Sequence, residues 1–464
     1  MLKVLFLVLM VSGLPVAIAM AGASLAYVAW SGDTPSFVVI QRMVAGIDSF
    51  PLLAVPFFIL AGNLMNNAGI TTRIFDFALA LVGWLKGGLG HVNVIGSVIF
   101  AGMSGTAIAD AAGLGTIEIK AMKEHGYSTE FAVGVTAASA TLGPIIPPSL
   151  PFVIYGMMAN VSVGALFLAG ILPGVLMATL MMLTVTYFAH KHGWGRDIVF
   201  SSPRFLKALA ELGVVVAWPL GLWLVVAKLG APPQISVFVA LALLFVVDRV
   251  FRFDALLPIM TPVLLIGGMT TGLFTPTEGA IAACVWAMIL GFAWYRTLSW
   301  KMFVKVCLDT VETTSTVLFI VAAASIFGWM LTATGVTADI AAWVLSVTKE
   351  AWLFLLLANL LMLFVGCFLE PTAAITILVP ILLPIAAQLG IDPIHFGLVM
   401  VLNLMIGLLH PPMGLVLYVL ARVAKLSIER TTMAILPWLV PLLISLALVT
   451  YVPIISLWLP RLAM

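Results

Sequence analysis

Charged residues are scarce in this 464-residue sequence, where Asp, Glu, Lys and Arg together make up 9% of the chain. A soluble globular domain carries about 25% charged residues, and the mean hydropathy here is +1.22. So little charge cannot solvate a surface, which excludes a soluble enzyme, a nucleic-acid-binding protein and a disordered scaffold. Cysteine is also rare, with three residues that have no metal-ligand spacing. We expect these cysteines to pack in apolar surroundings, without a disulfide framework or a resident metal or other cofactor.

Long uncharged runs predict the membrane segments, because each helical crossing needs about 20 apolar residues. The runs are apolar on all sides and do not alternate, so strands of a membrane barrel are excluded. The sequence therefore predicts an all-α polytopic membrane protein with about eleven crossings and two re-entrant helical hairpins. The predicted crossings are residues 4–30, 51–72, 130–158, 162–188, 213–229, 234–251, 255–274, 279–295, 315–335, 394–421 and 432–459, and the hairpins are 92–122 and 351–389.

The positively charged residues predict the orientation, since Lys and Arg accumulate in cytoplasmic loops. The crossing count places three basic clusters on one side, with the N-terminus cytoplasmic and the C-terminus outside. These clusters are Lys191/Arg196/Arg204/Lys207, Arg296/Lys301/Lys305 and Arg422/Lys425/Arg430. A cleavable signal peptide ending near Ala17-Ile18-Ala19 is an alternative for the N-terminus. The apolar run continues to Trp30, which favours a retained helix.

The chain aligns with itself at an offset of 264 residues. Gly102 meets Gly366, Gly143 meets Gly407, and Pro147-Pro148 meets Pro411-Pro412. We expect a first unit at 1–190, an inter-repeat segment at 191–264 with an extra helix pair, and a second unit at 265–464. Three predicted crossings separate the units, so the second is inverted. Inverted repeats with interrupted helices are typical of secondary transporters; a duplication without a transport role is the alternative.

The interruptions carry polar residues, prolines and glycines at matched places. Pro-Pro removes two backbone donors and breaks a helix, which leaves helix ends and carbonyl oxygens in the interior. Such oxygens suit Na⁺, whereas helix N-termini favour an anionic substrate. The alternative is that small residues only ease helix packing. The residues concerned are Ser104, Gly105, Thr106, Ser139, Thr141, Gly143 and Ser149 in the first unit, and Gly366, Thr372, Asn403 and Gly407 in the second.

Ionisable residues within apolar segments are costly and usually functional. Asp110 and Glu370 are candidates for coordinating a cation, carrying a proton or pairing with a hydroxyl. Glu278 has a second interpretation, as a cap at the start of the helix from 279. For Arg42 we expect a solvated or headgroup-facing position. His410 is a further polar side chain at the interruption of the second unit.

At these residues the chain resembles the large membrane (M) subunit of tripartite ATP-independent periplasmic (TRAP) transporters. The matching stretches cover nearly the whole chain except about 208–255. They are QRMVAGIDSFPLLAVPFFILAGNLMNNAGIT (41–71), GMSGTAIADAAGLGTIEIKAM (102–122), TAASATLGPIIPPSLPFVIYG (136–156), GLFTPTEGAIAA (272–283) and FLEPTAAITILVPILLPIAAQLGIDPIHFGLVMVLNLMIG (368–407).

The resemblance implies Na⁺-driven uptake of a small organic anion, such as a C4-dicarboxylate or a sugar acid, by an elevator-type mechanism in a bacterial inner membrane. It also implies a periplasmic substrate-binding (P) subunit and a small four-helix membrane (Q) subunit as partners. Carried over to this sequence, it implies a first Na⁺ site at Ser104, Gly105, Thr106, Ser139, Thr141 and Gly143. A second Na⁺ site then comprises Gly366, Glu370, Thr372, Asn403, Gly407 and His410. The substrate is expected at Asp110, Pro147, Pro148, Ser149, Pro411 and Pro412.

The sequence departs from the family pattern at Lys120, where Pro is usual, and at His410, where Thr is usual. The inter-repeat segment also has three predicted crossings instead of one. A stand-alone ion-coupled divalent-anion carrier is the competing transporter. An intramembrane enzyme using Asp110, Glu370 or His410 is a further alternative, which the absence of HExxH and GxSxG motifs disfavours.

Overall fold

A computed structural model describes residues 2–32, 34–229, 233–253, 255–270, 273–411 and 414–463. Every regular element in this part of the chain is a helix, as predicted. The first half contains α1 (Leu2–Val11), α2 (Val16–Ser31), α3 (Phe37–Ile47), η1 (Phe50–Leu53), α4 (Ala54–Asn67), α5 (Ile70–Val82), α6 (Gly88–Ser104), α7 (Ala107–Ala112), α8 (Leu114–Glu124), α9 (Thr129–Ala140), α10 (Leu150–Ala159) and α11 (Val163–Lys191). The second half contains α12 (Ser202–Leu229), α13 (Pro233–Phe251), α14 (Leu256–Thr270), α15 (Pro276–Met288), η2 (Ile289–Trp294), α16 (Trp300–Ala333), α17 (Val336–Val347), α18 (Ala351–Gly366), α19 (Pro371–Gln388), α20 (Pro393–Gly407), α21 (Leu415–Ala424), α22 (Ile428–Tyr451) and α23 (Ile454–Ala463).

Six helical stretches among the described residues are long and apolar enough to cross a membrane. They are Phe50–Asn67, Val163–Lys191, Pro276–Trp294, Trp300–Ala333, Pro371–Gln388 and Ile428–Tyr451. Many of the other helices are apolar but shorter. This pattern supports a multi-pass membrane protein, while the number of about eleven crossings stays a prediction.

Some segments expected to be continuous helices are divided. The stretch 4–30 breaks between α1 and α2, where Gly13 has a φ of 88° and Pro15 precedes α2. Within the stretch 51–72, α4 ends at Asn67, and α5 begins after Gly69, which has a φ of 70°. The stretch 432–459 breaks before Pro453, between α22 and α23. Left-handed glycine and proline explain these breaks, because neither continues an α-helix readily.

Helices of the two halves begin at corresponding places when 264 is added to the residue number. The segment of α7 and α8 corresponds to α19, α9 to α20, α10 to α21 and α11 to α22. The packing follows the same correspondence. When 264 is added, α4 corresponds to α16 and α2 corresponds to α15, and the contact between α4 and α15 is matched by the contact between α16 and α2. Each half thus has a helical hairpin, α6 to α8 or α18 to α19, and a broken helix, α9/α10 or α20/α21.

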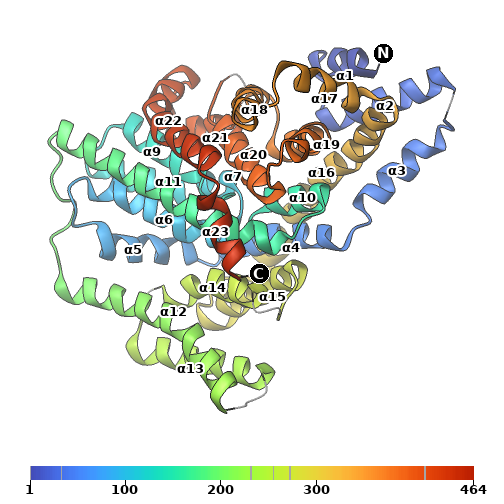
Figure 1. Cartoon of the computed structure of the whole chain (residues 1–464). Coiled ribbons are helices and arrows are strands. Elements are labelled where there is room, and N and C mark those ends of the chain that lie inside the picture. The colour runs from blue at the N-terminus through green and yellow to red at the C-terminus, as the bar shows by residue number, and fades with distance from the viewer. Residues whose placement is uncertain are drawn as a thin grey trace.

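The extra pair α12 and α13 lies at one edge of the molecule, beyond α14 and α15 (Figure 1). Two buried acids attach it. Glu211 Oε2 accepts a hydrogen bond of 3.2 Å from the Ala255 backbone N–H. Asp248 Oδ2 accepts one of 3.0 Å from Trp294 Nε1. The pair is therefore part of the folded body.

The segment after α11 folds back over the start of the first hairpin. Asp197 Oδ2 accepts a hydrogen bond of 2.8 Å from the Leu89 backbone and one of 2.6 Å from the Tyr127 hydroxyl. Gly87 N–H donates to the Gly195 carbonyl at 3.0 Å. Burial, together with the Asp197 carboxylate, raises the pKa of Tyr127, so its hydroxyl stays protonated and keeps donating. This segment thereby ties the base of α6 to the turn before α9.

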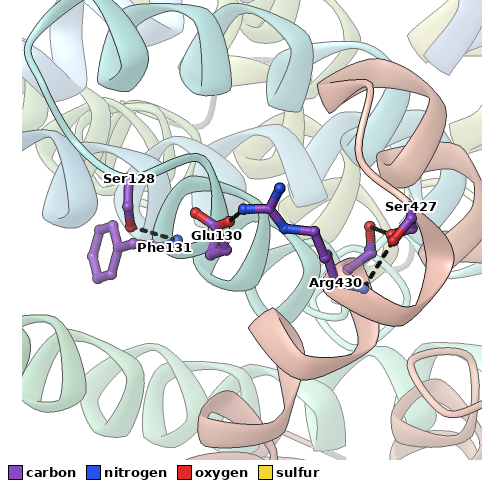
Figure 2. Close-up of polar contacts among 6 residues, drawn as sticks. Ser128, Glu130, Phe131, Ser427 and Arg430 are labelled. Carbon is purple, nitrogen blue, oxygen red and sulfur yellow. Dashed lines mark hydrogen bonds and ion pairs between the residues drawn. The ribbon is translucent and has the colours of Figure 1, made fainter.

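An ion pair joins the two halves where α9 and α22 pack together. The Arg430 guanidinium in the first turn of α22 donates to the Glu130 carboxylate in the first turn of α9 (Figure 2). Serine hydroxyls cap both helices: Ser128 accepts from Phe131 N–H, and Ser427 accepts from Arg430 N–H (Figure 2). The pair therefore lies beside two helix N-termini.

Candidate functional site

A cavity of about 370 Å³ lies where the tips of both hairpins meet. Five of the predicted site residues line it: Ser104, Gly105, Thr106, Glu370 and Thr372. The first residues of α10, the end of α20 and the facing sides of α4 and α16 complete the wall. The cavity is therefore lined by residues from both halves of the chain.

The first hairpin tip is a tight turn against the broken helix α9/α10. Gly105 has a φ of 63°, and a Cβ atom placed on it would lie 2.6 Å from the Pro148 carbonyl oxygen. Only glycine fits this approach. Thr106 then caps α7, with its hydroxyl accepting a hydrogen bond of 3.3 Å from Ala109 N–H. The buried Ser104 Oγ has no hydrogen-bond partner among the described residues.

The second hairpin tip places Glu370 at the N-cap of α19. Its Oε2 accepts hydrogen bonds from Thr372 N–H at 3.0 Å and Ala373 N–H at 3.4 Å. Its Oε1 accepts from the Thr372 hydroxyl at 2.9 Å. The carboxylate is thus held rigidly at the cavity wall. Behind the tip, a Cβ on Gly407 would lie 2.7 Å from the Gly366 Cα, so the two backbones are in direct contact.

The break in the first broken helix lies directly behind the first tip. The Ser149 hydroxyl donates to the Pro144 carbonyl at 2.5 Å and accepts from Phe152 N–H at 3.3 Å, which caps α10. Pro147 and Pro148 are joined by a cis peptide bond. A Cβ on Gly143 would lie 3.1 Å from the Thr106 carbonyl oxygen, and Thr141 bonds its own helix, at Ala138 O. These residues shape the backbone that supports the tip.

Ser139 and Asn403 do not line the cavity; each binds an asparagine on the first helix of its hairpin. Ser139 Oγ donates to Asn93 Oδ1 at 2.7 Å. Asn403 Nδ2 donates to the Asn359 side-chain oxygen at 2.8 Å and to its carbonyl at 3.0 Å. Asn403 Oδ1 is buried and has no hydrogen-bond partner in the described part of the chain. The two positions hold the hairpins against the broken helices.

Asp110 also lies away from the cavity, within a buried polar cluster of the first hairpin. Asn93 Nδ2 donates to Glu118 Oε2 at 2.6 Å and to Thr136 Oγ1 at 2.8 Å. Asp110 Oδ2 and Glu118 Oε1 are both buried without a hydrogen-bond partner within the described ranges. The sequence reasoning missed Glu118, although a single acid on an apolar helix face was the available signal.

The remaining predicted residues lie at or beyond the break in the second broken helix. His410 is half-buried, and its Nδ1 lies 3.0 Å from the Ile406 carbonyl oxygen. Pro411 is exposed, and Pro412 lies outside the described residues. Neither His410 nor Pro411 lines the cavity.

Two asparagines on α4, which the sequence reasoning also missed, form the wall opposite the hairpin tips. Asn63 Nδ2 donates to Thr310 Oγ1 of α16 at 3.1 Å, and Asn66 Oδ1 accepts from Thr71 Oγ1 at 3.1 Å. Thr313 of α16 lines the same wall. No Lys or Arg is among the described residues that line the cavity. Its polarity therefore comes from hydroxyl, amide and backbone groups, with Glu370 as the ionisable group.

Other sequence expectations have definite outcomes. Glu278 forms a capping box with Thr275 at the start of α15, so its interpretation as a helix cap is confirmed. The Arg42 guanidinium lies 5.0 Å from the centre of the Trp329 ring, which packs the side chain against α16. Cys284, Cys307 and Cys367 are free thiols.

Comparison with known proteins gives the same family as the sequence motifs. Residues 3–455 match the model of the "Tripartite ATP-independent periplasmic transporter, DctM component". The sialic acid TRAP transporter large permease protein SiaM of Vibrio cholerae is 41% identical over 98% of this chain and 96% of its own length. The C4-dicarboxylate TRAP transporter large permease protein DctM of Rhodobacter capsulatus is 33% identical over 99% and 98%. The sialic acid permease SiaT of Haemophilus influenzae is 38% identical over 98% of this chain and 67% of its own.

Solved structures support the fold at lower sequence identity. The YdaH transporter of Alcanivorax borkumensis superposes with a TM-score of 0.54 at 16% identity, covering 89% of this chain and 88% of that one. The MtrF protein of Neisseria gonorrhoeae gives a TM-score of 0.56 at 10% identity, covering 90% and 83%. The helical architecture described above is thus similar to that of known transporters.

Proposed function

Because the chain belongs to the DctM family, the large permease component of TRAP transporters, we propose that it carries a small organic anion across the bacterial inner membrane by coupling to Na⁺. Its family consists of transporter permease subunits, so the chain is a transport protein and not an enzyme. The relatives are permeases for sialic acid, C4-dicarboxylate and 2,3-diketo-L-gulonate. These three compounds are carboxylates, and a further relative is a permease for isethionate, a sulfonate; the relatives therefore support a small organic anion as the substrate.

The observation that carries the proposal is the single cavity between the two hairpin tips. An anion there meets the hydroxyl of Thr106 and the amides of Asn63 and Asn66 on α4, with the N-terminal turn of α10 nearby, while the Thr372 hydroxyl donates to Glu370. Helix N-termini favour negative charge. Pro147, Pro148, Ser149 and Pro411 support the breaks rather than touch the substrate in this proposal, and Asp110 belongs to the cluster behind the first tip.

For Na⁺ we retain two sites, one behind each tip. A cation needs oxygen ligands, and two buried oxygens are available for this role. Ser104 Oγ at the first tip and Asn403 Oδ1 at the second have no hydrogen-bond partner within the described residues. Buried oxygens of this kind normally have a partner. The backbone at Gly105, Gly143, Gly366 and Gly407 supplies further oxygens, while Ser139 and the Asn403 amide position the hairpins.

The partners follow from the tripartite family. We propose a small membrane subunit packed beside this chain and a periplasmic binding protein that delivers the anion. Transport then proceeds by movement of the unit that holds both hairpins, as an elevator. The N-terminus faces the cytoplasm and the C-terminus the periplasm in this arrangement, which labelling of single cysteines introduced at each end tests directly.

The decisive experiment reconstitutes the chain with its small subunit in vesicles and measures uptake of radiolabelled sialic acid and succinate. We expect uptake only with an inward Na⁺ gradient and with the cognate binding protein present. Ser104→Ala should raise the Na⁺ concentration for half-maximal uptake, whereas Ser346→Ala, an exposed serine on α17, should not. Uptake without a binding protein would favour a stand-alone carrier. Uptake that needs no ion gradient would overturn the proposal.

A further inference from the structure

A second concave site lies on the outer face of α11, away from the central cavity. It is a groove of about 480 Å³ between α11 and the start of α6, and it shares no lining residue with the central cavity. Five of its residues come from α11: Thr179, Met182, Leu183, Thr186 and His190. Their spacing places them on one face of the helix. Leu85, Lys86 and His91 form the opposite side.

The groove changes from basic to apolar along the axis of α11. Lys86 and His190 are exposed at one end, whereas Met182 and Leu183 lie farther along the helix. From His190 to Thr179 the helix rises by about 16 Å, at about 1.5 Å per residue. Since α11 is long and apolar enough to span the membrane, the basic end lies near a membrane surface and the apolar end lies toward the bilayer interior.

Lys86, at the basic end of the groove, has no acidic partner in the described part of the chain. Lys86 forms no ion pair with any described residue, and its backbone lies beside Arg196 in an isolated β-bridge. The neighbouring acid, Asp197, is already bonded to Leu89 N–H and the Tyr127 hydroxyl. His190 contacts the Thr186 carbonyl through Nδ1 at 2.8 Å, which leaves Nε2 directed elsewhere. Positive charge is therefore concentrated at this end of the groove.

A buried histidine, His91, lies at the floor of the groove. His91 is 3% exposed, and its Nδ1 has no hydrogen-bond partner among the residues that the structure describes. Its Nε2 lies 3.4 Å from the Thr186 hydroxyl, a long contact. A buried polar atom without a partner is uncommon in a native fold, so the polar part of the groove is incomplete within the chain itself.

We propose that this groove binds one anionic phospholipid, with its phosphate at Lys86 and His190 and an acyl chain along Met182, Leu183 and Thr179. A lipid fits better than a soluble anion because the apolar part of the groove continues toward the membrane interior. The ligand would contact both α6, the first helix of a hairpin, and α11, the last helix of the same repeat unit. It therefore stabilises the packing of the first hairpin.

Native mass spectrometry of the purified chain with its small membrane subunit tests the proposal. The probes are phosphatidylglycerol and phosphatidylcholine, added in equal amounts to the detergent-solubilised complex. We expect phosphatidylglycerol to be retained preferentially. A basic residue near anionic lipid contributes about 1 kcal/mol, so Lys86→Gln should lower that preference about fivefold. Lys123→Gln, which changes an exposed lysine near the end of α8 that does not line the groove, is the matched control and should leave it unchanged.

A second variant tests the acyl chain separately and carries little risk to folding. Thr179 is exposed on the side of α11 that lines the groove, and Thr179→Phe fills the apolar part of the groove. It should reduce retention of phosphatidylglycerol without changing the basic end. Equal retention of the two lipids, no effect of both variants, or displacement of the lipid by 10-fold excess inorganic phosphate would each overturn the proposal.

Discussion

Thr106 and Glu370 are 264 residues apart, and each is the N-cap of the second helical arm of a hairpin. Thr106 accepts a hydrogen bond from Ala109 N–H, and Glu370 accepts two from Thr372 and Ala373 N–H. Both line the same cavity. The two corresponding positions thus carry a hydroxyl cap in the first half of the chain and a carboxyl cap in the second. The two hairpin tips share a backbone design but differ in the chemistry of the cap.

The first prediction concerns these caps. Thr106→Ala should destabilise the protein by about 1 kcal/mol, the usual cost of losing an N-cap. Glu370→Ala should cost more, because two backbone donors and the Thr372 hydroxyl lose their acceptor. Glu370→Gln keeps an acceptor and should restore most of the thermal stability while weakening Na⁺ activation of uptake. Thermal unfolding of the purified complex provides the measurement.

Thr432→Ala serves as the control for the cap variants. Thr432 is half-buried on α22, and its hydroxyl donates to the Ile428 carbonyl. If this change shifts the unfolding temperature as much as Thr106→Ala, then Thr106 contributes no more than an ordinary helix threonine.

The second prediction concerns the contact between Asn403 and Asn359. Asn403→Ala removes two hydrogen bonds and leaves the Asn359 carbonyl oxygen buried without this donor, at a cost of about 1–3 kcal/mol. Because the residues are in direct contact, the double variant Asn359→Ala/Asn403→Ala should cost less than the sum of the single variants. Chemical unfolding of all four proteins measures the coupling. Additive costs would mean that the two side chains do not act together.

Much of this architecture was predictable from residues that interrupt apolar runs. Gly and Pro near residues 105, 147, 366 and 411 predicted breaks, and the tips of both hairpins contain Ser104, Gly105, Thr106, Glu370 and Thr372 as expected. The predicted assignment of these residues to Na⁺ stays a prediction. Backbone-breaking residues act locally, which is why a single sequence reveals them.

The partners of the polar residues were not predictable in the same way. Asn93, Asn359 and Asn66 each stand in an apolar helix, and their contacts depend on how distant helices pack. Gly113 shows the difficulty: it lies between α7 and α8, and a Cβ added to it would lie 2.7 Å from the Asn66 side-chain Nδ2. No local pattern around residue 113 indicates a contact with residue 66.

The third prediction compares two glycines within helices. Gly407→Ala places a Cβ 2.7 Å from the Gly366 Cα, so α18 and α20 must separate behind the second tip. We expect a loss of stability of about 1–3 kcal/mol from this overpacking and a strong loss of uptake. Gly213→Ala in α12 meets no atom within 4 Å and should be neutral or stabilising, because alanine favours a helix. If Gly407→Ala changed the stability as little as Gly213→Ala does, α18 and α20 would tolerate separation.

The last prediction concerns the ion pair between Glu130 and Arg430. The two side chains are 38% and 66% exposed, and exposed pairs contribute about 0.2–1 kcal/mol. Arg430→Gln should therefore lower the unfolding temperature only slightly, and added salt should reduce the difference, since salt screens exposed charges. The exchange variant Glu130→Arg/Arg430→Glu restores opposite charges; it places Arg at the N-terminus of α9, where the helix dipole disfavours a cation, and Glu at the N-terminus of α22, where the dipole favours an anion. Because these two effects oppose each other, its stability should return close to that of the unchanged protein, whereas a stability no higher than that of the single variant would mean that the surroundings of each helix end, and not the pair, determine the stability of this contact.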